Sequence, residues 1–297
     1  MNRPRLCAIV PTFDPGSQVT RCIESLADQV DQIIVVDDGS KPRFKPMPCD
    51  LDSRSVTLFD SDTNHGVAAA LNRGVLWALS HDFMWAITVD QDTIVGPDLV
   101  ARLFAALDAS PDADRVAMVG PRLVHPESRA RAPSDSRAYR QVSQLVASGS
   151  LVRIDALRDV GFFDESFIID RVDFDICARL RGVGYLLLEA PQAELRHAPG
   201  DTQQVHLLGR VFRRQTHNYK RRYYMARNTI WLVRRYALRD PIWVLRRVTV
   251  LGIQLAAIAL FENDKWRKLD ASLGGLLDGL RGRSGSRYPD MRVGPQK

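Results

Sequence analysis

The sequence predicts an α/β protein in which helices cover both faces of a mostly parallel central sheet, with a helical extension at the C-terminal end. Two observations favour this fold class. Apolar runs rich in β-branched residues alternate with amphipathic stretches of helical period through residues 1–205. Short links join these runs, and such alternation gives a parallel sheet that is buried on both faces.

The expected elements follow from these two patterns in chain order. A buried strand at 6–11 precedes a helix at 17–29, whose apolar residues recur at helical spacing. The next strand, 32–40, is apolar until it stops at two aspartates and a Gly-Ser turn. The other expected elements are strands at 56–60, 84–90 and 115–124, helices at 67–79 and 97–107, and helical structure from about 207 to 281 with a start at Pro241.

Composition and cysteine spacing argue against a disulfide-stabilised, a secreted or a membrane-spanning protein. The chain has 297 residues, of which 45% are hydrophobic and 26% charged, as in ordinary globular proteins. Its four cysteines are scattered without metal-ligand spacing, which indicates reduced thiols in the cytoplasm. The N-terminus lacks a signal-peptide pattern, and no run of about 18 apolar residues is present. The apolar run 248–261 has the length of a buried or interfacial helix.

The net charge of +6 is concentrated in one segment. Residues 207–247 hold twelve of the 41 Lys and Arg and one of the 35 acidic residues, leaving 29 basic and 34 acidic residues elsewhere. This asymmetry predicts an anionic partner for the segment. Aromatic residues interleaved with the basic ones would also suit nucleic acid. The apolar run that follows favours a lipid headgroup surface instead, and the alternative is a solvated basic face.

Carboxylates stand at the ends of two expected strands. Asp37 and Asp38 end one strand, and Asp90 and Asp92 end another in WAITVDQDTIV. Ligands of parallel sheets bind outside the carboxyl ends of the strands. Two nearby carboxylates repel each other unless a cation lies between them. The pairs are therefore either turn residues or a cation and ligand site.

Several motifs in order resemble the family 2 glycosyltransferases with the GT-A fold, a Rossmann-like sheet. They are VPTFDP, VVDDGS, NHGVAAALNRG, VDQD and ASGSLVRIDALRDVGFFDESFIIDRVDFDICARLR, followed by a later His. RRYYMARNTIWLVRRY and NDKWRKLDASLGGLLDGLRGRSG look like the bacterial rhamnosyltransferases of that family. The resemblance implies a glycosyltransferase domain at 1–205, with a nucleotide-sugar half at about 1–120 and an acceptor half at about 121–205. Residues 206–297 form a basic, amphipathic helical region.

The resemblance implies a donor site at the strand ends. A divalent cation, Mg²⁺ or Mn²⁺, neutralises the leaving diphosphate, and one or two aspartates suffice to hold it. Asp92 is the expected metal ligand, with Asp90 and Gln91 nearer the ribose or sugar. Other residues implied to contact the nucleotide sugar are Pro11, Thr12, Phe13, Asp37, Asp38, Asn64, Gly66 and Asn72. The family usually has Tyr-Asn where this chain has Phe13-Asp14, a departure that places this contact in question.

The acceptor hydroxyl needs a base, and a carboxylate is suited to that role. IIDRVDFDICARLR offers Asp170, Asp173 and Asp175. Alignment with the family motif favours Asp173, and Asp170 remains the alternative because the two share a helical face. The resemblance also implies that His197 completes the metal site. Gly149 and Ser150 resemble a turn on the acceptor side, where small residues let the backbone approach a sugar.

The expected function is thus an inverting, metal-dependent transfer of L-rhamnose from dTDP-L-rhamnose to a surface polysaccharide or lipid-linked glycan. The protein is expected in the cytoplasm, peripheral at the inner face of the cell membrane, with no nucleic-acid partner. One alternative is a transferase that uses a UDP- or GDP-sugar. Another is a non-catalytic module that binds a nucleotide sugar at the membrane. The acceptor and the oligomeric state stay open.

Overall fold

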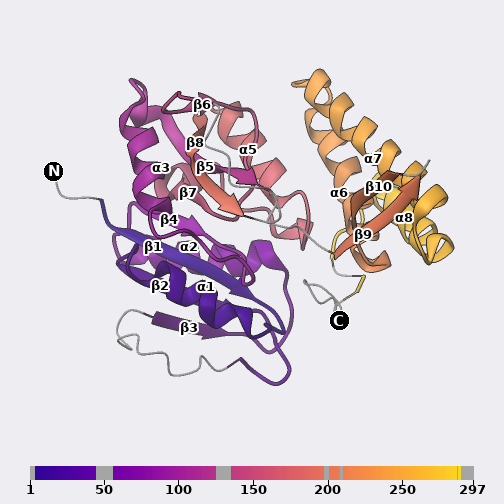
Figure 1. Cartoon of the computed structure of the whole chain (residues 1–297), viewed down its shortest axis with the longest axis horizontal. Helices are drawn as coiled ribbons and strands as arrows, with labels where there is room; N and C mark the ends of the chain where they lie inside the picture. The colour runs from indigo at the N-terminus through magenta and orange to yellow at the C-terminus, as the bar shows by residue number, and fades with distance from the viewer. Residues whose placement is uncertain are drawn as a thin grey trace. The chain divides into compact units, whose positions relative to one another are not determined.

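The N-terminal part of the chain folds around an eight-stranded sheet in the computed structural model (Figure 1). The structure describes residues 4–44, 56–124, 135–196, 201–207, 210–285 and 287–288, with the backbone alone at 201–215. The chain divides into two compact units, described separately below. Unit 1 is Met1–Glu165 with Asp173–Ala198, and unit 2 is Ser166–Val172 with Pro199–Lys297.

The sheet of unit 1 is mixed, with most of its strand pairs parallel. Its strand order is β3-β2-β1-β4-β7-β5-β8-β6. The pairs β3–β2, β2–β1, β1–β4 and β5–β8 are parallel, and the three others are antiparallel. The strands are β1 Leu6–Thr12, β2 Gln32–Asp37, β3 Val56–Asp60, β4 Trp85–Thr88, β5 Val116–Val124, β6 Arg140–Gln141, β7 Ser150–Arg153 and β8 Leu186–Arg196.

Helices cover both faces of this sheet, as the sequence predicts. On one face, α1 and α3 pack with alternate strand residues such as Leu6, Ala8 and Ile87 into the main core. On the other face, α2 packs closely on β1: a Cβ added at Gly74 would stand only 2.5 Å from the Ile9 side chain. The helices are α1 Gln18–Ala27, α2 Val67–Ser80, α3 Leu99–Asp108, α4 Ile154–Asp159 and α5 Val172–Gly182, with 3₁₀ turns η2 Ala113–Arg115 and η3 Glu165–Phe167.

The described residues of unit 2 form a hairpin and three helices. The strands β9 Asp201–Leu207 and β10 Arg210–Thr216 pair antiparallel, and α6 Tyr219–Tyr236, α7 Pro241–Phe261 and α8 Lys265–Arg281 follow. The expectation of helix from about 207 is therefore wrong up to residue 218. Several residues of the hairpin are β-branched and favour strand, and pairing between the strands outweighs any local preference of the basic residues.

The three helices of unit 2 begin and pack for identifiable reasons. The Asn218 side chain caps α6 by accepting a hydrogen bond from the Arg221 N–H at 2.9 Å. Helix α7 begins at Pro241, as predicted, with the Asp240 side chain as its cap. Helices α6 and α8 approach so closely that a Cβ on Gly275 would stand 2.2 Å from the Tyr223 carbonyl oxygen.

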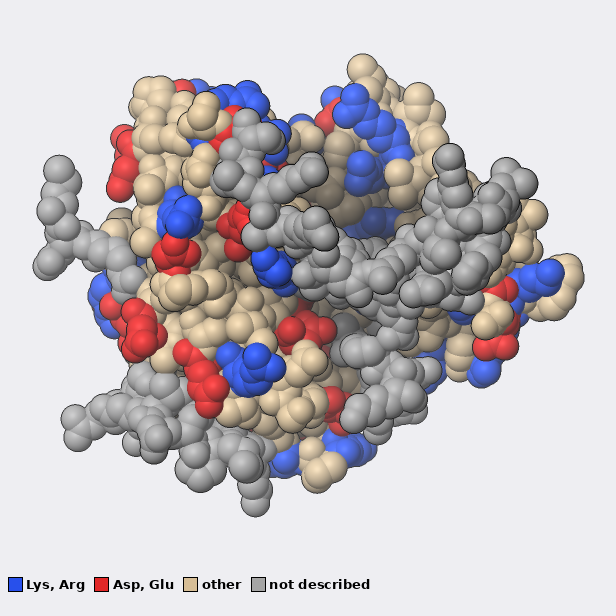
Figure 2. Space-filling model, viewed as in Figure 1, with Lys and Arg blue, Asp and Glu red and all other residues tan. Residues whose placement is uncertain are grey.

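The basic segment is less exposed than its composition suggests. Arg222 and Arg227 of α6 are buried, and the carboxylate of Glu262 pairs with Arg222 at 2.6 Å. Arg221 pairs with Asp170 at 3.0 Å. Part of the positive charge of residues 207–247 therefore stabilises unit 2 internally. On the face of unit 1 shown in Figure 2, acidic and basic side chains lie interspersed.

Helix α7 is the one helix among the described residues that is long and apolar enough to cross a membrane, by length and composition only. Its 18-residue apolar window has a mean hydropathy of 1.7, and 17% of that window is buried. The helix is longer than the run 248–261 because it also includes residues 241–247. Of the two alternatives for this run, a buried or an interfacial helix, the buried one is wrong, since most of α7 is exposed.

Candidate active site

The carboxyl ends of β1 and β2 lie side by side, and Asp37 joins them. Thr12 pairs with Asp37 in the parallel ladder. The buried Asp37 carboxylate accepts hydrogen bonds from the Thr12 and Ser40 hydroxyls and from the Phe44 N–H. Asp37 therefore fixes the loop that follows β2. Pro11, one residue earlier on β1, lies opposite Val36.

Asp38 lies at the N-terminus of α2, within the same loop. Its carboxylate accepts hydrogen bonds from the His65 N–H at 2.9 Å and the Gly66 N–H at 2.7 Å. Burial raises the pKa of Asp38, and the two N–H donors oppose that rise. Gly39, at φ 87°, lets this loop lie against Asn64, since a Cβ there would stand 2.9 Å from the Asn64 nitrogen. Asp38, Asn64 and Gly66 thus lie together.

Gln91 joins the loop after β1 to the loop after β4. Its side chain accepts a hydrogen bond from the Phe13 N–H at 2.8 Å and donates one to the Phe13 carbonyl at 3.3 Å. The Asp14 N–H in turn donates to the Ser40 hydroxyl at 2.7 Å. The loops that follow β1, β2 and β4 therefore form one connected rim. This arrangement confirms that the strand-end motifs face a common edge of the sheet.

Asp90 and Asp92 have different surroundings on this rim. The Asp90 N–H donates to the Ser148 hydroxyl at 3.0 Å, and its carbonyl accepts from Thr93 at 2.9 Å. Asp92 is exposed, and its carboxylate makes no hydrogen bond or ion pair with the part of the chain that the structure describes. Burial, together with the negative charges of Asp90 and Asp92, raises the pKa of the nearby Cys22 thiol to about 12. Two carboxylates are therefore concentrated after β4.

The turn before β7 supports the loop after β4. The Gly149 N–H donates to the Thr88 carbonyl at 2.7 Å, and the Thr88 hydroxyl donates to the Ala147 carbonyl at 2.6 Å. Gly149 has a φ of 78°, and a Cβ there would stand 2.6 Å from Leu195. The Ser150 hydroxyl is buried and donates to the Val146 carbonyl at 2.6 Å. Packing within unit 1 thus already requires small residues at both positions.

Asn72 is directed away from the rim, toward the chain before α5. Its buried side-chain amide donates to the Phe163 carbonyl and to Glu165 Oε1, both at 2.9 Å, and accepts from the Phe163 N–H at 2.9 Å. The amide thereby holds the backbone of Phe163 and the side chain of Glu165. The structure thus brings Asn72 to this segment, while the other predicted nucleotide residues lie on the rim.

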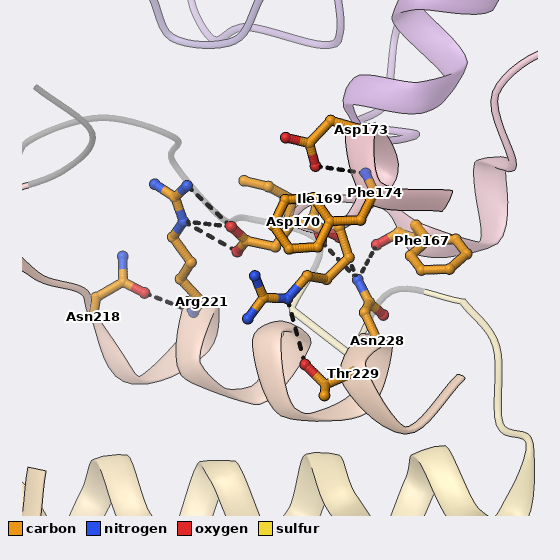
Figure 3. A network of polar contacts seen from close by, with 10 residues as sticks. Phe167, Ile169, Asp170, Asp173, Phe174, Asn218, Arg221, Asn228 and Thr229 are labelled. Carbon is orange, nitrogen blue, oxygen red and sulfur yellow. Dashed lines mark hydrogen bonds and ion pairs between the residues drawn. The ribbon is translucent and has the colours of Figure 1, made fainter. Parts of the chain in front are cut away.

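The three candidate bases have distinct partners. Asp173 is half-buried in the first turn of α5 and accepts a hydrogen bond from the Phe174 N–H at 2.9 Å. Asp175 is buried against Arg179, with its carboxylate 2.7 Å from the Arg179 Nε. Asp170, in unit 2, accepts from the Arg221 guanidinium at 3.0 Å (Figure 3). Despite burial, the charge of Arg221 holds the pKa of Asp170 below its usual value.

The seven residues Ser166–Val172, here called the strap, belong to unit 2 and run directly into Asp173. Ile168, Asp170 and Arg171 have φ values of 59°, 62° and 67°. Non-glycine residues rarely adopt this left-handed region, and β-branched ones such as Ile168 least of all. Each such residue costs roughly 1–3 kcal/mol and persists only where its surroundings fix it. The strap therefore stores strain next to the predicted base.

Sequence reasoning missed the residues of α6 that hold the strap. The Asn228 side chain donates to the carbonyls of Phe167, Ile169 and Asp170 at 2.8–2.9 Å (Figure 3). Arg227 donates to the Ser166 carbonyl at 2.9 Å. One signal was available, because asparagine is unfavourable inside a helix unless its side chain has a specific partner.

The described residues fit a divalent cation that is held by few protein ligands. They contain no group of three or more His, Cys, Asp or Glu side chains that could hold a metal. His197, the predicted further ligand, lies outside the described residues. Mg²⁺ binds commonly through one or two carboxylates plus substrate phosphates, so the exposed Asp92 carboxylate beside Asp90 suits such a site.

Solved structures show the same fold. Residues 1–349 of TarS from S. aureus match at a TM-score of 0.59 and 14% identity, over 93% of this chain and 80% of that one. The mannosyltransferase PcManGT from Pyrobaculum calidifontis, solved with GDP-Man and Mn²⁺, matches at 0.58 and 17%, over 95% and 88%. GalNAc-T7, solved with UDP, GalNAc and Mn²⁺, matches at 0.59 and 14%, over 94% and 56%. These identities establish the GT-A fold alone.

The sequence comparisons identify the family. No curated protein sequence matches the chain significantly. The family model described as glycosyl transferase family 2 matches residues 7–154, from β1 to the start of α4. This range includes all three rim loops and both carboxylates after β4. Through these residues, the chain belongs to glycosyl transferase family 2.

Proposed function

We propose that this protein is an inverting, metal-dependent glycosyltransferase that moves L-rhamnose from dTDP-L-rhamnose to a hydroxyl of a surface polysaccharide or lipid-linked glycan. One observation carries the proposal: within the family-matched residues, Asp90 and Asp92 follow β4 on a rim that also contains the loops after β1 and β2. This edge is where ligands of open α/β sheets bind.

The rim residues bind and orient the donor. Asp92 holds a divalent cation, Mg²⁺ or Mn²⁺, which when bound neutralises charge on the departing diphosphate. Asp90 orients the ribose or the sugar. Gln91 keeps the first loop in place through its two hydrogen bonds to the Phe13 backbone. The presence of Mn²⁺ in PcManGT and GalNAc-T7 supports a divalent cation here.

Asp173 acts as the base. Its carboxylate accepts the proton of the acceptor hydroxyl, whose oxygen attacks the anomeric carbon as the bond to the diphosphate breaks. Asp170 is the poorer candidate, because Arg221 occupies its carboxylate and lowers its pKa. Replacing Asp173 by Asn should abolish transfer while leaving nucleotide binding intact. Full turnover by Asp173→Asn would refute the assignment.

The choice of rhamnose is supported by the resemblance of the C-terminal motifs. The similar structures were solved with UDP-GlcNAc, with GDP-Man, and with UDP and GalNAc, so a transferase of another nucleotide sugar is the competing hypothesis. A thermal-shift screen of dTDP-, UDP- and GDP-sugars, with and without Mn²⁺, tests it. The largest shift should come with dTDP-L-rhamnose and metal. A preference for a UDP-sugar would refute the rhamnosyl donor.

We also propose that the protein lies in the cytoplasm, peripheral at the inner face of the cell membrane, and that α7 contacts anionic lipid there. Ile242, Leu245, Ile253 and Leu260 are exposed on α7 at spacings that place them on one helical face. No charged residue occurs between 248 and 261, and Arg246 and Arg247 precede this stretch. Basic residues beside an apolar helical face match an anionic lipid surface.

Vesicle flotation tests this contact. The protein should float with vesicles containing anionic phosphatidylglycerol and less with neutral phosphatidylcholine alone. Ile253→Glu should abolish flotation, whereas Leu76→Glu, at an exposed leucine of unit 1, should not. If Ile253→Glu instead converts a dimer to a monomer in the absence of vesicles, α7 is an interface between two copies and the lipid proposal is wrong.

A further inference from the structure

The strap adopts a conformation that its own sequence does not favour. Three of its seven residues, Ile168, Asp170 and Arg171, have positive φ, although none is glycine. Such a backbone needs external support, and the support comes from α6 of the same unit. Strained segments held in this way are concentrated at functional sites.

Polar contacts from α6 hold the strap backbone. The carbonyls of four strap residues, Ser166, Phe167, Ile169 and Asp170, accept hydrogen bonds from Arg227 or Asn228. Asn228 is fully buried, and its amide nitrogen contacts three of these carbonyls with only two hydrogens. The Asp170 side chain is fixed in addition by the Arg221 guanidinium at 3.0 Å.

Apolar contacts fix the strap side chains between these hydrogen bonds. The Phe167 ring packs edge-on against Trp231, with ring centroids 5.5 Å apart. Ile169 is buried in a cluster with Tyr223, Tyr224 and Ala271. Because both the backbone and the side chains of the strap are fixed, its conformation is set by α6.

The residues on either side of the strap belong to unit 1. On its N-terminal side, the Asn72 amide holds Phe163 and Glu165. On its C-terminal side, Val172 is followed directly by Asp173 in the first turn of α5. A shift of the strap therefore moves the residue that the proposed reaction uses as its base. Misplacement of a reacting group by about 1 Å can lower a rate by about 100-fold.

We propose that Asn228 is a positioning residue for transfer: it holds the strap in its strained conformation and thereby orients the carboxylate of Asp173. This inference rests on the proposed role of Asp173 as the base. Asn228 acts through the backbone that precedes Asp173 and takes no part in proton transfer itself. Arg221 supports the same segment through Asp170.

The test compares Asn228→Ala with Glu262→Gln. Both remove buried polar contacts of α6, but the Glu262 carboxylate bonds to Arg222, Lys268 and Thr216, which lie outside the strap. The measured reaction is hydrolysis of the sugar nucleotide that gave the largest thermal shift, with water as the acceptor. Its rate is followed as release of the nucleoside diphosphate, at a temperature below the unfolding temperature of each variant. Hydrogen–deuterium exchange of a peptide spanning 166–174 reports on the strap.

Asn228→Ala should lower the rate roughly 100-fold, leave the donor Kd unchanged and speed exchange of the strap peptide. Glu262→Gln should destabilise unit 2 but change neither the rate nor the strap exchange. If Asn228→Ala does not fold, Arg221→Gln serves in its place, with the same direction and a smaller loss.

Two failures can be told apart. If Asp173→Asn retains full activity, the base assignment of the proposed function is wrong, whatever Asn228→Ala does. If Asp173→Asn is inactive but Asn228→Ala behaves like Glu262→Gln in both rate and strap exchange, Asn228 is only structural and the positioning role is wrong.

Discussion

Glu262→Gln is expected to destabilise unit 2 strongly, because it alters a buried cluster of charges. The Glu262 carboxylate lies 2.6 Å from the Arg222 guanidinium and 2.9 Å from the Lys268 ammonium. The side chains of Glu262, Arg222 and Lys268 are 1%, 4% and 12% exposed. Glutamine keeps the volume of the side chain but removes its charge, so two buried cations lose their counterion.

The magnitude follows from this burial. Removing one partner of a buried ion pair costs about 3–5 kcal/mol. Because Lys268 keeps some contact with water, we expect the lower part of that range, about 3 kcal/mol in the free energy of unfolding. The surface pair Asp98 and Arg102, whose side chains are 55% and 46% exposed, serves as the control. Asp98→Asn should cost less than about 1 kcal/mol.

Urea denaturation at pH 7, followed by tryptophan fluorescence, measures both changes. Three of the five tryptophans, Trp231, Trp243 and Trp266, lie in unit 2 and report on its unfolding. Glu262→Gln should move the midpoint of this transition to lower urea. Asp98→Asn should barely move the midpoint of unit 1, which contains Asp98 and the two other tryptophans, Trp77 and Trp85. A loss in Glu262→Gln no larger than that in Asp98→Asn would refute the reasoning from burial.

Three further predictions follow from single residues. Asp92→Asn should abolish the Mn²⁺-dependent part of the thermal shift with donor but leave the melting temperature of the free protein unchanged. If Mn²⁺ still increases the thermal shift of Asp92→Asn with donor, Asp92 is not the metal ligand. Burial, aided by Arg221, lowers the pKa of His217 from 6.5 to about 4, so the unfolded state binds more protons between these values. The free energy of unfolding of unit 2 should therefore fall by up to about 1.4 kcal/mol per pH unit on acidification from pH 6.5 toward 4. His217→Gln should make the free energy of unfolding less dependent on pH, which urea midpoints measured at pH 7 and 4.5 would show. Gly275→Ala should lower the free energy of unfolding by about 1–3 kcal/mol, because its Cβ would stand 2.2 Å from a backbone oxygen. The control Gly274→Ala should be tolerated, because its Cβ would stand 2.9 Å from the flexible end of Arg287. Equal urea midpoints for the two variants would contradict the close packing of α6 and α8.

The N-terminal fold could be predicted because local pattern and tertiary role agree there. The strands at 6–12 and 32–37 are apolar and rich in β-branched residues, and the first is followed directly by a helix with one apolar face. The aspartates at the ends of β2 and β4 mark the rim of the candidate site. Periodicity was therefore enough to predict the sheet, and strand-end polarity was enough to predict which loops lie on one rim.

Unit 2 could not be predicted to the same extent, because its structure depends on contacts between distant residues. Whether Arg222 faces solvent or Glu262 depends on a pairing across 40 residues, which a count of charge does not register. The hairpin at 201–216 depends on the pairing of its two strands. Likewise, the role of Asn72 follows from a contact with Phe163, 91 residues later, that has no local signature.

The discontinuity of unit 2 determines where hybrid enzymes can be joined. A chimera that exchanges only residues 199–297 would combine a foreign α6 with the native Ser166–Val172, and the hydrogen bonds to its carbonyls would depend on chance agreement between the two parents. A chimera that transplants both segments carries the supporting residues together with the loop they support. Recombination in this family should therefore succeed with two junctions around residues 166–172 and a third near 198, and a single junction should lose transfer even where both parents are active.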